Sequence, residues 1–137
     1  MSHRLLKVLQ EVVRHELVLL AIAGAVGTLA RYWLGGFVQR IAGESFPWGT
    51  LVVNVLGCLL FGFVWPLAGE RMLISGQTRM IILVGFMGAF TTFSTFAFET
   101  EDFLADAEWL RGLGNIALQN ILGIAAVGLG FVIARFI

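Results

Sequence analysis

Four long runs of apolar residues limit what this chain can fold into. The runs cover residues 17–41, 48–69, 80–98 and 113–137. A helix needs about 20 mostly apolar residues to cross the hydrocarbon core of a bilayer, which is about 30 Å thick. Each run is long enough, and the short gaps between them require neighbouring helices to run in opposite directions. We therefore predict an all-α membrane protein with four transmembrane helices.

The composition agrees with a chain whose solvent is lipid. Hydrophobic residues make up 58% of the sequence and charged residues 13%, whereas soluble domains carry about 25% charged residues. The formal net charge is +0, which gives no reason to expect a nucleic-acid partner. We expect the lipid bilayer as the surroundings and a multi-pass location in a cell membrane.

The first sixteen residues differ from the rest of the chain. Apolar residues recur at helical spacing from Leu5 to Val13, with Arg4, Lys7 and Arg14 among them. This pattern predicts an amphipathic surface helix over residues 1–16, ahead of a transmembrane domain over residues 17–137. Lys and Arg are in excess on the side of the amino terminus, but half of that excess belongs to the extension. Without it the bias is too small to fix an orientation.

Arg31 and Asn54 are polar residues inside the first and second runs. Polar groups at membrane depth are costly and are often functional. Arg31 either snorkels to the nearby interface or forms a fixed positive charge that attracts anions. Asn54 either bonds a neighbouring helix or offers its amide N–H groups to a permeating ion. No acidic residue lies in the interior of a predicted run, which favours an anion near Arg31.

The third run carries the densest group of polar side chains. Thr91, Thr92, Ser94 and Thr95 follow Gly88 at mid-membrane. Glycine, serine and threonine are indifferent or poor helix formers, and unwound backbone is tolerated in a membrane where it is buried in protein or lines a cavity. We therefore predict that the third helix is broken between Gly88 and Thr92. Broken helices at mid-membrane commonly bind ions. The alternative is an intact helix whose hydroxyls bond back to their own backbone.

Phenylalanines at positions 90, 93 and 96 would lie along one face of a continuous helix. Such a stripe usually serves packing. A phenyl ring also has an electropositive edge, so rings placed edge-on can contact an anion without offering a competing negative group.

The fourth run adds three amide side chains, those of Asn115, Gln119 and Asn120. Asn120 is the deepest and the best candidate for lining a polar path. Small residues recur at four-residue spacing at positions 126, 130 and 134, which predicts close helix packing. We interpret these stripes as a sign that two subunits pack together, because four spans alone do not surround a pore comfortably.

The predicted membrane interior offers hydrogen-bond donors and aromatic edges but almost no carboxylates, which selects for anions. The sequence has no nucleophile–base pair, metal-ligand spacing or phosphate-binding loop, so we do not expect an enzyme.

The polar and aromatic residues described above resemble those of the Fluc (CrcB) family of bacterial fluoride channels. Three stretches carry the resemblance: residues 24–32 with Arg31, residues 47–50 (Pro-Trp-Gly-Thr) followed by Asn54 and Gly57, and residues 85–99 with a Thr-Thr-Phe-Ser-Thr-Phe core. The resemblance covers nearly the whole chain except the amino-terminal extension.

The resemblance implies an antiparallel, dual-topology homodimer with two fluoride pores and a structural Na⁺ between the subunits. It also implies passive fluoride export across the cell inner membrane, which protects the cell from fluoride. The implied pore residues are Arg31, Asn54, Thr92, Phe93, Ser94, Thr95, Phe96, Glu99 and Asn120. The implied Na⁺ ligands are the backbone carbonyls of Gly88 and Thr91.

Two other functions are compatible with four short spans. A proton-coupled small multidrug exporter needs a carboxylate within the membrane, usually in the first span, and the predicted first span has none. A non-transporting membrane scaffold would keep the small-residue stripes but would have no use for the cluster of Phe, Thr and Ser.

Overall fold

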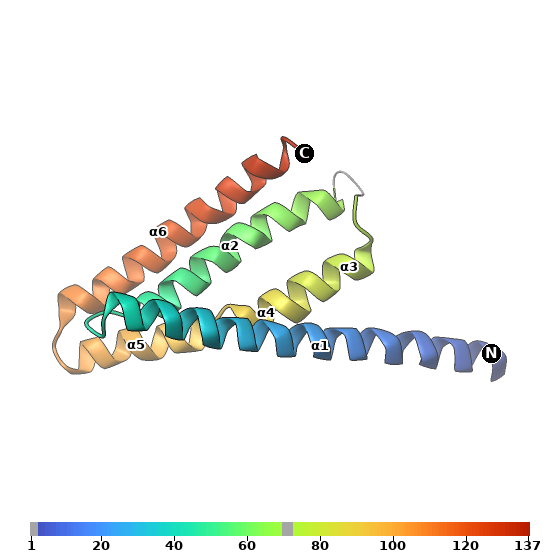
Figure 1. Ribbon diagram of the computed structural model, residues 1–137, viewed down its shortest axis with the longest axis horizontal. Coiled ribbons are helices and arrows are strands. Elements are labelled where there is room, and N and C mark those ends of the chain that lie inside the picture. Colours follow the sequence, from blue (N-terminus) through green and yellow to red (C-terminus); the bar gives the residue numbers. More distant parts are fainter. Residues whose placement is uncertain (1–2, 70–72) are drawn as a thin grey trace.

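The computed structural model describes residues 3–69 and 73–137. Side chains are described from residue 13 onward, except those of residues 68 and 69. The described residues form helices joined by short connections (Figure 1). The helices are α1 (His3–Ala42), α2 (Trp48–Gly69), α3 (Gly76–Met80), the π-helix η1 (Ile81–Met87), α4 (Gly88–Phe90), α5 (Phe93–Ala105) and α6 (Trp109–Ala134). Four segments are long and apolar enough to cross a membrane: Val13–Ala42, Trp48–Leu67, Gly76–Ala105 and Trp109–Ala134. The prediction of four spanning helices is confirmed.

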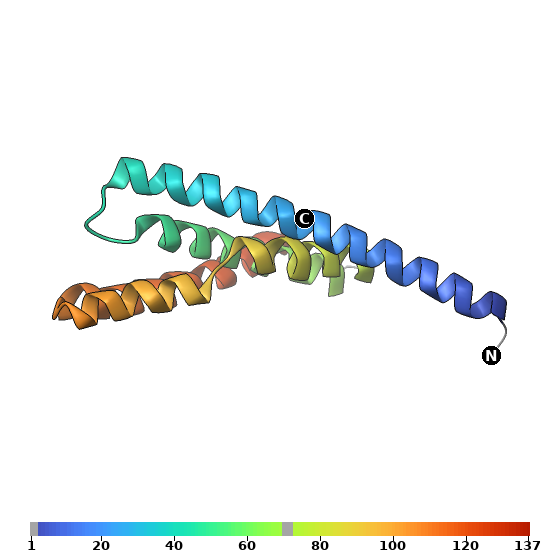
Figure 2. The same ribbon diagram turned by 90° about the horizontal axis from the view of Figure 1, so that it is seen from below.

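Helix α1 is continuous from His3 to Ala42, so residues 3–16 extend the first span without a bend or break. Its 40 residues reach about 60 Å at the helical rise of 1.5 Å per residue, about twice the thickness of the bilayer core. Figure 2 shows its amino-terminal part projecting beyond the other helices. The side chains of residues 1–12 lie outside the described residues, so the surface location of this segment stays a prediction.

The third span extends further than the sequence indicates. Helix α5 continues to Ala105 and α6 begins at Trp109, so most of the acidic stretch after Phe98, predicted as a loop, is helical. The hydroxyl of Thr100 accepts a hydrogen bond from the buried Asn115 Nδ2 at 3.0 Å, and this contact ties α5 to α6. Glu99 therefore lies inside the third candidate spanning segment, six residues before its end at Ala105.

Helices α2 and α6 lie side by side in both ribbon views (Figures 1 and 2). A side chain added at Gly130 would collide with the backbone of Leu59, and one added at Gly62 would collide with Val127. The predicted small-residue stripe of α6 is thus confirmed as a close-packing surface, with Ala134 fully buried. Because its partner here is α2 of the same chain, the stripe does not by itself indicate a second subunit.

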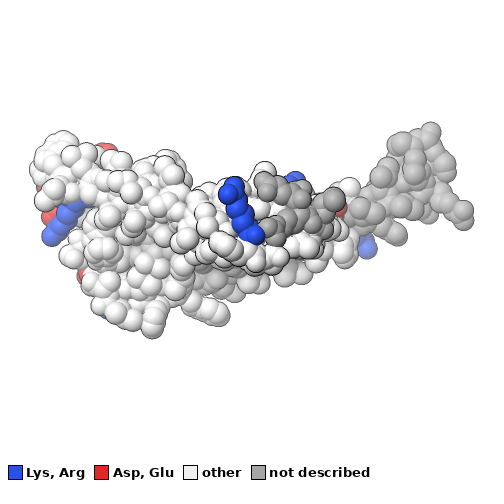
Figure 3. Space-filling view, turned by 90° about the horizontal axis from the view of Figure 1, so that it is seen from above, with Lys and Arg blue, Asp and Glu red and all other residues white. Residues whose placement is uncertain are grey.

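The two ends of the bundle are anchored by aromatic contacts. At one end the ring of Phe46, in the connection from α1 to α2, lies 4.8 Å from the Trp48 ring and 6.2 Å from the Phe103 ring of α5. At the other end the Arg79 guanidinium lies 5.0 Å from the Trp65 ring. Between the ends, the space-filling view in Figure 3 is mostly white, that is, uncharged. Such a surface suits lipid or another apolar partner.

Candidate functional site: a broken helix between two hollows

The third span is interrupted at Thr91 and Thr92, whose backbones are extended (φ −83°, ψ 161° and φ −150°, ψ 115°). The break predicted between Gly88 and Thr92 is confirmed and is narrower than predicted, because Gly88 is still helical. The Thr91 hydroxyl donates to Met87 O at 3.0 Å and closes the first half of the span. The Thr92 hydroxyl accepts from Thr95 N at 3.2 Å and caps the second half, a role that threonine performs well.

Asn54 of α2 holds the break in place. Its Oδ1 accepts from the Thr92 N–H at 2.8 Å, and its Nδ2 donates to Thr92 O at 3.0 Å. The side chain thus pairs with the peptide of Thr92 as a neighbouring strand would. Nδ2 also donates to Gln119 Oε1 at 3.1 Å, which links the break to α6. Asn54 has two N–H groups, and both have acceptors.

These contacts remove the usual partners of two backbone carbonyls. In a continuous helix Gly88 O would accept from the N–H of Thr92, but that N–H bonds Asn54. Thr91 O would accept from the N–H of Thr95, but that N–H bonds the Thr92 hydroxyl. Thr91 O instead accepts from Arg31 Nη1 at 3.2 Å.

The same two carbonyls are those expected to bind Na⁺. Hard cations prefer oxygen ligands, and Gly88 O has lost its helical donor. A carbonyl oxygen has two lone pairs, so the bond from Arg31 leaves one lone pair of Thr91 O for a cation. The donor set of the break therefore fits such an ion.

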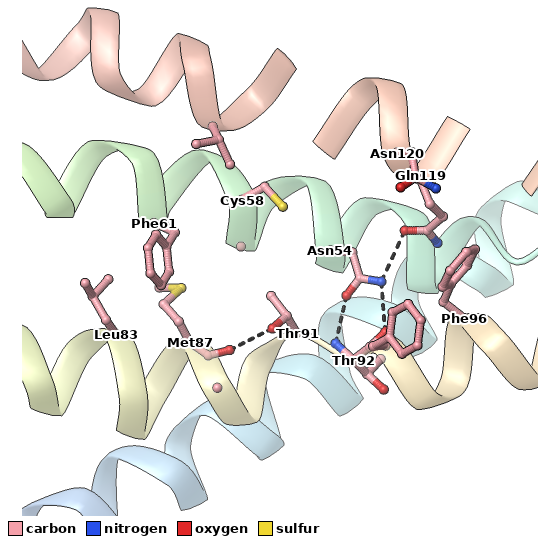
Figure 4. A pocket seen from close by; sticks show the side chains of 14 residues that line it. Asn54, Cys58, Phe61, Leu83, Met87, Thr91, Thr92, Phe96, Gln119 and Asn120 are labelled. Carbon is pink, nitrogen blue, oxygen red and sulfur yellow. Dashed lines mark hydrogen bonds between the residues drawn. The ribbon is translucent and has the colours of Figure 1, made fainter. Parts of the chain in front are cut away.

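A first hollow of about 360 Å³ opens beside the break (Figure 4). Its polar lining comes from Asn54, Thr91, Thr92, Gln119 and Asn120, and its aromatic lining includes Phe61, Phe93 and Phe96. The rings of Phe93 and Phe96 meet edge to face, with centroids 5.5 Å apart. No carboxylate is among the lining residues.

A second hollow of about 660 Å³ is lined by Arg31, Thr50, Thr95 and Glu99, among others. The Thr50 hydroxyl donates to Glu99 Oε1 at 2.6 Å. Thr92 lines both hollows, so the broken segment separates a space with charged groups from a space with none.

The structure thus brings together most residues predicted from the sequence. Phe90 is an exception, because the break turns α5 away from α4. Phe90 is buried beside Phe86, with ring centroids 5.6 Å apart, and the predicted three-ring stripe is wrong. Ser94 is exposed near the Thr92 hydroxyl at 3.4 Å and lines neither hollow.

The polar contacts of the site differ in two places from those that the sequence indicates. Asn120 reaches the first hollow, but its Nδ2 donates to Ile116 O of its own helix at 2.7 Å, and its neighbour Gln119 makes the contact with Asn54. Thr50 was not singled out as the partner of Glu99. Gln119 lies one turn after the buried Asn115, and this spacing was the available signal.

Comparison with known proteins agrees with this architecture. Residues 18–131 match the family model described as CrcB-like protein, Camphor Resistance (CrcB). The chain belongs to the CrcB-like family. A relative from Nitrosococcus oceani, named fluoride-specific ion channel FluC, is 59% identical over 89% of this chain and 98% of its own length. Relatives with the same name from Solidesulfovibrio magneticus and Desulforapulum autotrophicum are 54% and 52% identical, over 89% and 90% of this chain and 98% of their own lengths.

Proposed function

We propose that this CrcB-like protein is a fluoride-specific ion channel that lets fluoride leave the cell passively across the inner membrane. The first hollow carries the proposal, because it joins phenyl edges and hydrogen-bond donors at membrane depth without a carboxylate. The three relatives named above bear the name of a fluoride-specific ion channel. Export would protect the cell from fluoride that enters as its weak acid.

The chemistry of fluoride suits this lining. Moving an isolated ion into a low-dielectric medium costs tens of kcal/mol, so the hydration shell has to be replaced step by step. Hydroxyls, amides and the rings of Phe93 and Phe96 supply weak contacts in sequence. No single contact should bind too tightly, because conduction requires release as well as entry.

The second hollow provides a wider, charged approach. Arg31 places a positive charge beside the break, and Glu99 is held by Thr50 on the same side. We assign to Arg31 the attraction of anions toward the break. Glu99 would limit how tightly an anion is held there.

We further propose that the working unit is an antiparallel homodimer with two pores. Both hollows are open on the surface of one chain, and polar groups facing lipid are costly, so another protein surface should cover them. A second copy, inserted the opposite way, can do so because the charge bias outside the extension is small. The carbonyls of Gly88 and Thr91 from two copies would then hold a central Na⁺.

Fluoride efflux from liposomes containing the purified protein tests the proposed function. Release without a pH gradient supports a channel. Release that requires a proton gradient supports instead a proton-coupled exporter, for which Glu99 would be the carboxylate. A folded protein that releases no fluoride under either condition supports the scaffold and contradicts the proposal.

A further inference from the structure

The charged groups that line the second hollow are mostly negative. Arg31 is the one cation among its described lining residues, against the three carboxylates of Glu44, Glu99 and Asp102. The first hollow has no charged residue in its lining. An anion that approaches the break through the second hollow therefore meets a field that the first hollow does not have.

Two of these four charges lie at the inner end of the second hollow. Arg31 Nη1 donates to Thr91 O at the break. Glu99 Oε1 accepts the hydroxyl proton of Thr50 on α2 at 2.6 Å. These two groups of opposite sign are held close to the broken segment by neighbouring helices.

The other two charges lie further out and are both carboxylates. Asp102 comes almost one turn after Glu99 on α5, and Glu44 belongs to the connection between α1 and α2; both residues are exposed. The Phe46 and Phe103 rings, 6.2 Å apart, join that connection to α5 at this end of the bundle. Among the described residues neither Glu44 nor Asp102 has an ion-pair partner. We call these two residues the outer rim of the second hollow.

We propose that the outer rim, Glu44 and Asp102, limits the rate at which fluoride enters through the second hollow. The inference rests on the proposed function. Charges of one sign at the mouth of a pore lower the local concentration of ions of the same sign. In water a unit charge about 10 Å from an anion changes that concentration about 2-fold. The rim acts before the ion reaches Arg31 and makes no contact with the ion at the break.

The alternative is that both carboxylates are ordinary solvated surface groups, and charge substitutions separate the two readings. Glu44→Gln and Asp102→Asn each remove one rim charge, and Asp102→Lys reverses one. Glu101→Gln and Glu101→Lys are the matched controls, because Glu101 is the exposed neighbour of Asp102 on α5 but does not line the hollow. Each variant has to elute like the wild type on gel filtration.

The measurement is the initial rate of fluoride efflux from liposomes at low fluoride concentration, where the rate reports entry. At about 10 mM ionic strength we expect Glu44→Gln and Asp102→Asn to conduct about 2-fold faster than the wild type, and Asp102→Lys about 4-fold faster. The Glu101 variants should gain less than the Asp102 variants. At about 1 M ionic strength all rates should converge, because the Debye length falls from about 30 Å to about 3 Å.

Rim variants that are no faster than the wild type at low ionic strength overturn the inference. Gains that persist at about 1 M, or equal gains in the Glu101 variants, overturn it as well. If one rim variant does not fold, the other decides, because Glu44 and Asp102 belong to different segments. A wild-type protein that releases no fluoride contradicts the proposed function instead, so the two failures are distinguishable.

Discussion

Replacing Asn54 by Asp tests how the broken helix is held. The substitution keeps Oδ1 for the Thr92 N–H at 2.8 Å. It replaces Nδ2 by a second oxygen, which then faces Thr92 O at the present distance of 3.0 Å. The Gln119 amide, 3.1 Å away, can turn over and donate to that oxygen, because its own N–H groups have no acceptor among the described residues. The hydrogen bond to Thr92 O thus becomes a contact between two acceptors.

The size of the effect follows from that contact. A buried acceptor that loses its donor costs about 1–3 kcal/mol. A cost of about 2 kcal/mol corresponds to a factor of about 30 in the equilibrium constant between the present arrangement of the break and its alternatives. The packing of α2 against α6 through Gly62 and Gly130 does not involve Asn54, so the helices should still assemble.

Fluoride efflux from liposomes and gel filtration, measured on the same preparation, give the two readouts. We expect Asn54→Asp to elute like the wild type and to conduct fluoride about 30-fold more slowly. Gln77→Glu makes the same change of amide to acid on an exposed site and should conduct normally. An Asn54→Asp protein that conducts at the wild-type rate would refute the role given to this side chain.

Three further perturbations have defined outcomes. Phe96→Ile keeps an apolar side chain but removes the ring edge next to Phe93. Fluoride efflux should therefore fall at least about 10-fold while the melting temperature changes little. Normal efflux would show that the ring does not contact the ion. Gly130→Ala should lower the melting temperature, because the new methyl group meets the backbone of Leu59. Gly128 has open space around it, so Gly128→Ala should leave the melting temperature unchanged or raise it. Equal melting temperatures of the two variants would contradict the close packing of α2 and α6. Replacing Na⁺ by a large organic cation throughout purification should lower the melting temperature of the proposed dimer, and an unchanged melting temperature would count against a Na⁺ site at the break.

The sequence was sufficient to predict the spans and the break. Run length and hydropathy reflect the thickness of the bilayer, which acts on each helix separately. The group of hydroxyls after Gly88 has a local effect as well, since Thr91 and Thr92 bond their own neighbours in the chain. Features that depend on one segment alone could therefore be predicted from the sequence without knowledge of the fold.

Features that depend on contact with a second segment of the chain could not be predicted from the sequence. Glu99 has its partner, Thr50, 49 positions away, and this distant contact accompanies a helix that continues beyond the predicted end of the span. Gln119 and Asn120 are adjacent in the sequence, and only the position of Asn54 shows which of them faces the network. Phe90 does not lie in line with Phe93 and Phe96, because the chain changes direction at the break between Phe90 and Phe93.

The reversal potential across a planar bilayer containing the purified protein tests the central claim most directly. With a fluoride gradient, equal chloride and equal pH on the two sides, a passive fluoride channel sets a potential near the equilibrium potential of fluoride. Adding a chloride gradient or a pH gradient should leave that potential unchanged. A potential that follows protons or chloride, or the absence of fluoride current in a folded preparation, would contradict fluoride permeation through this protein.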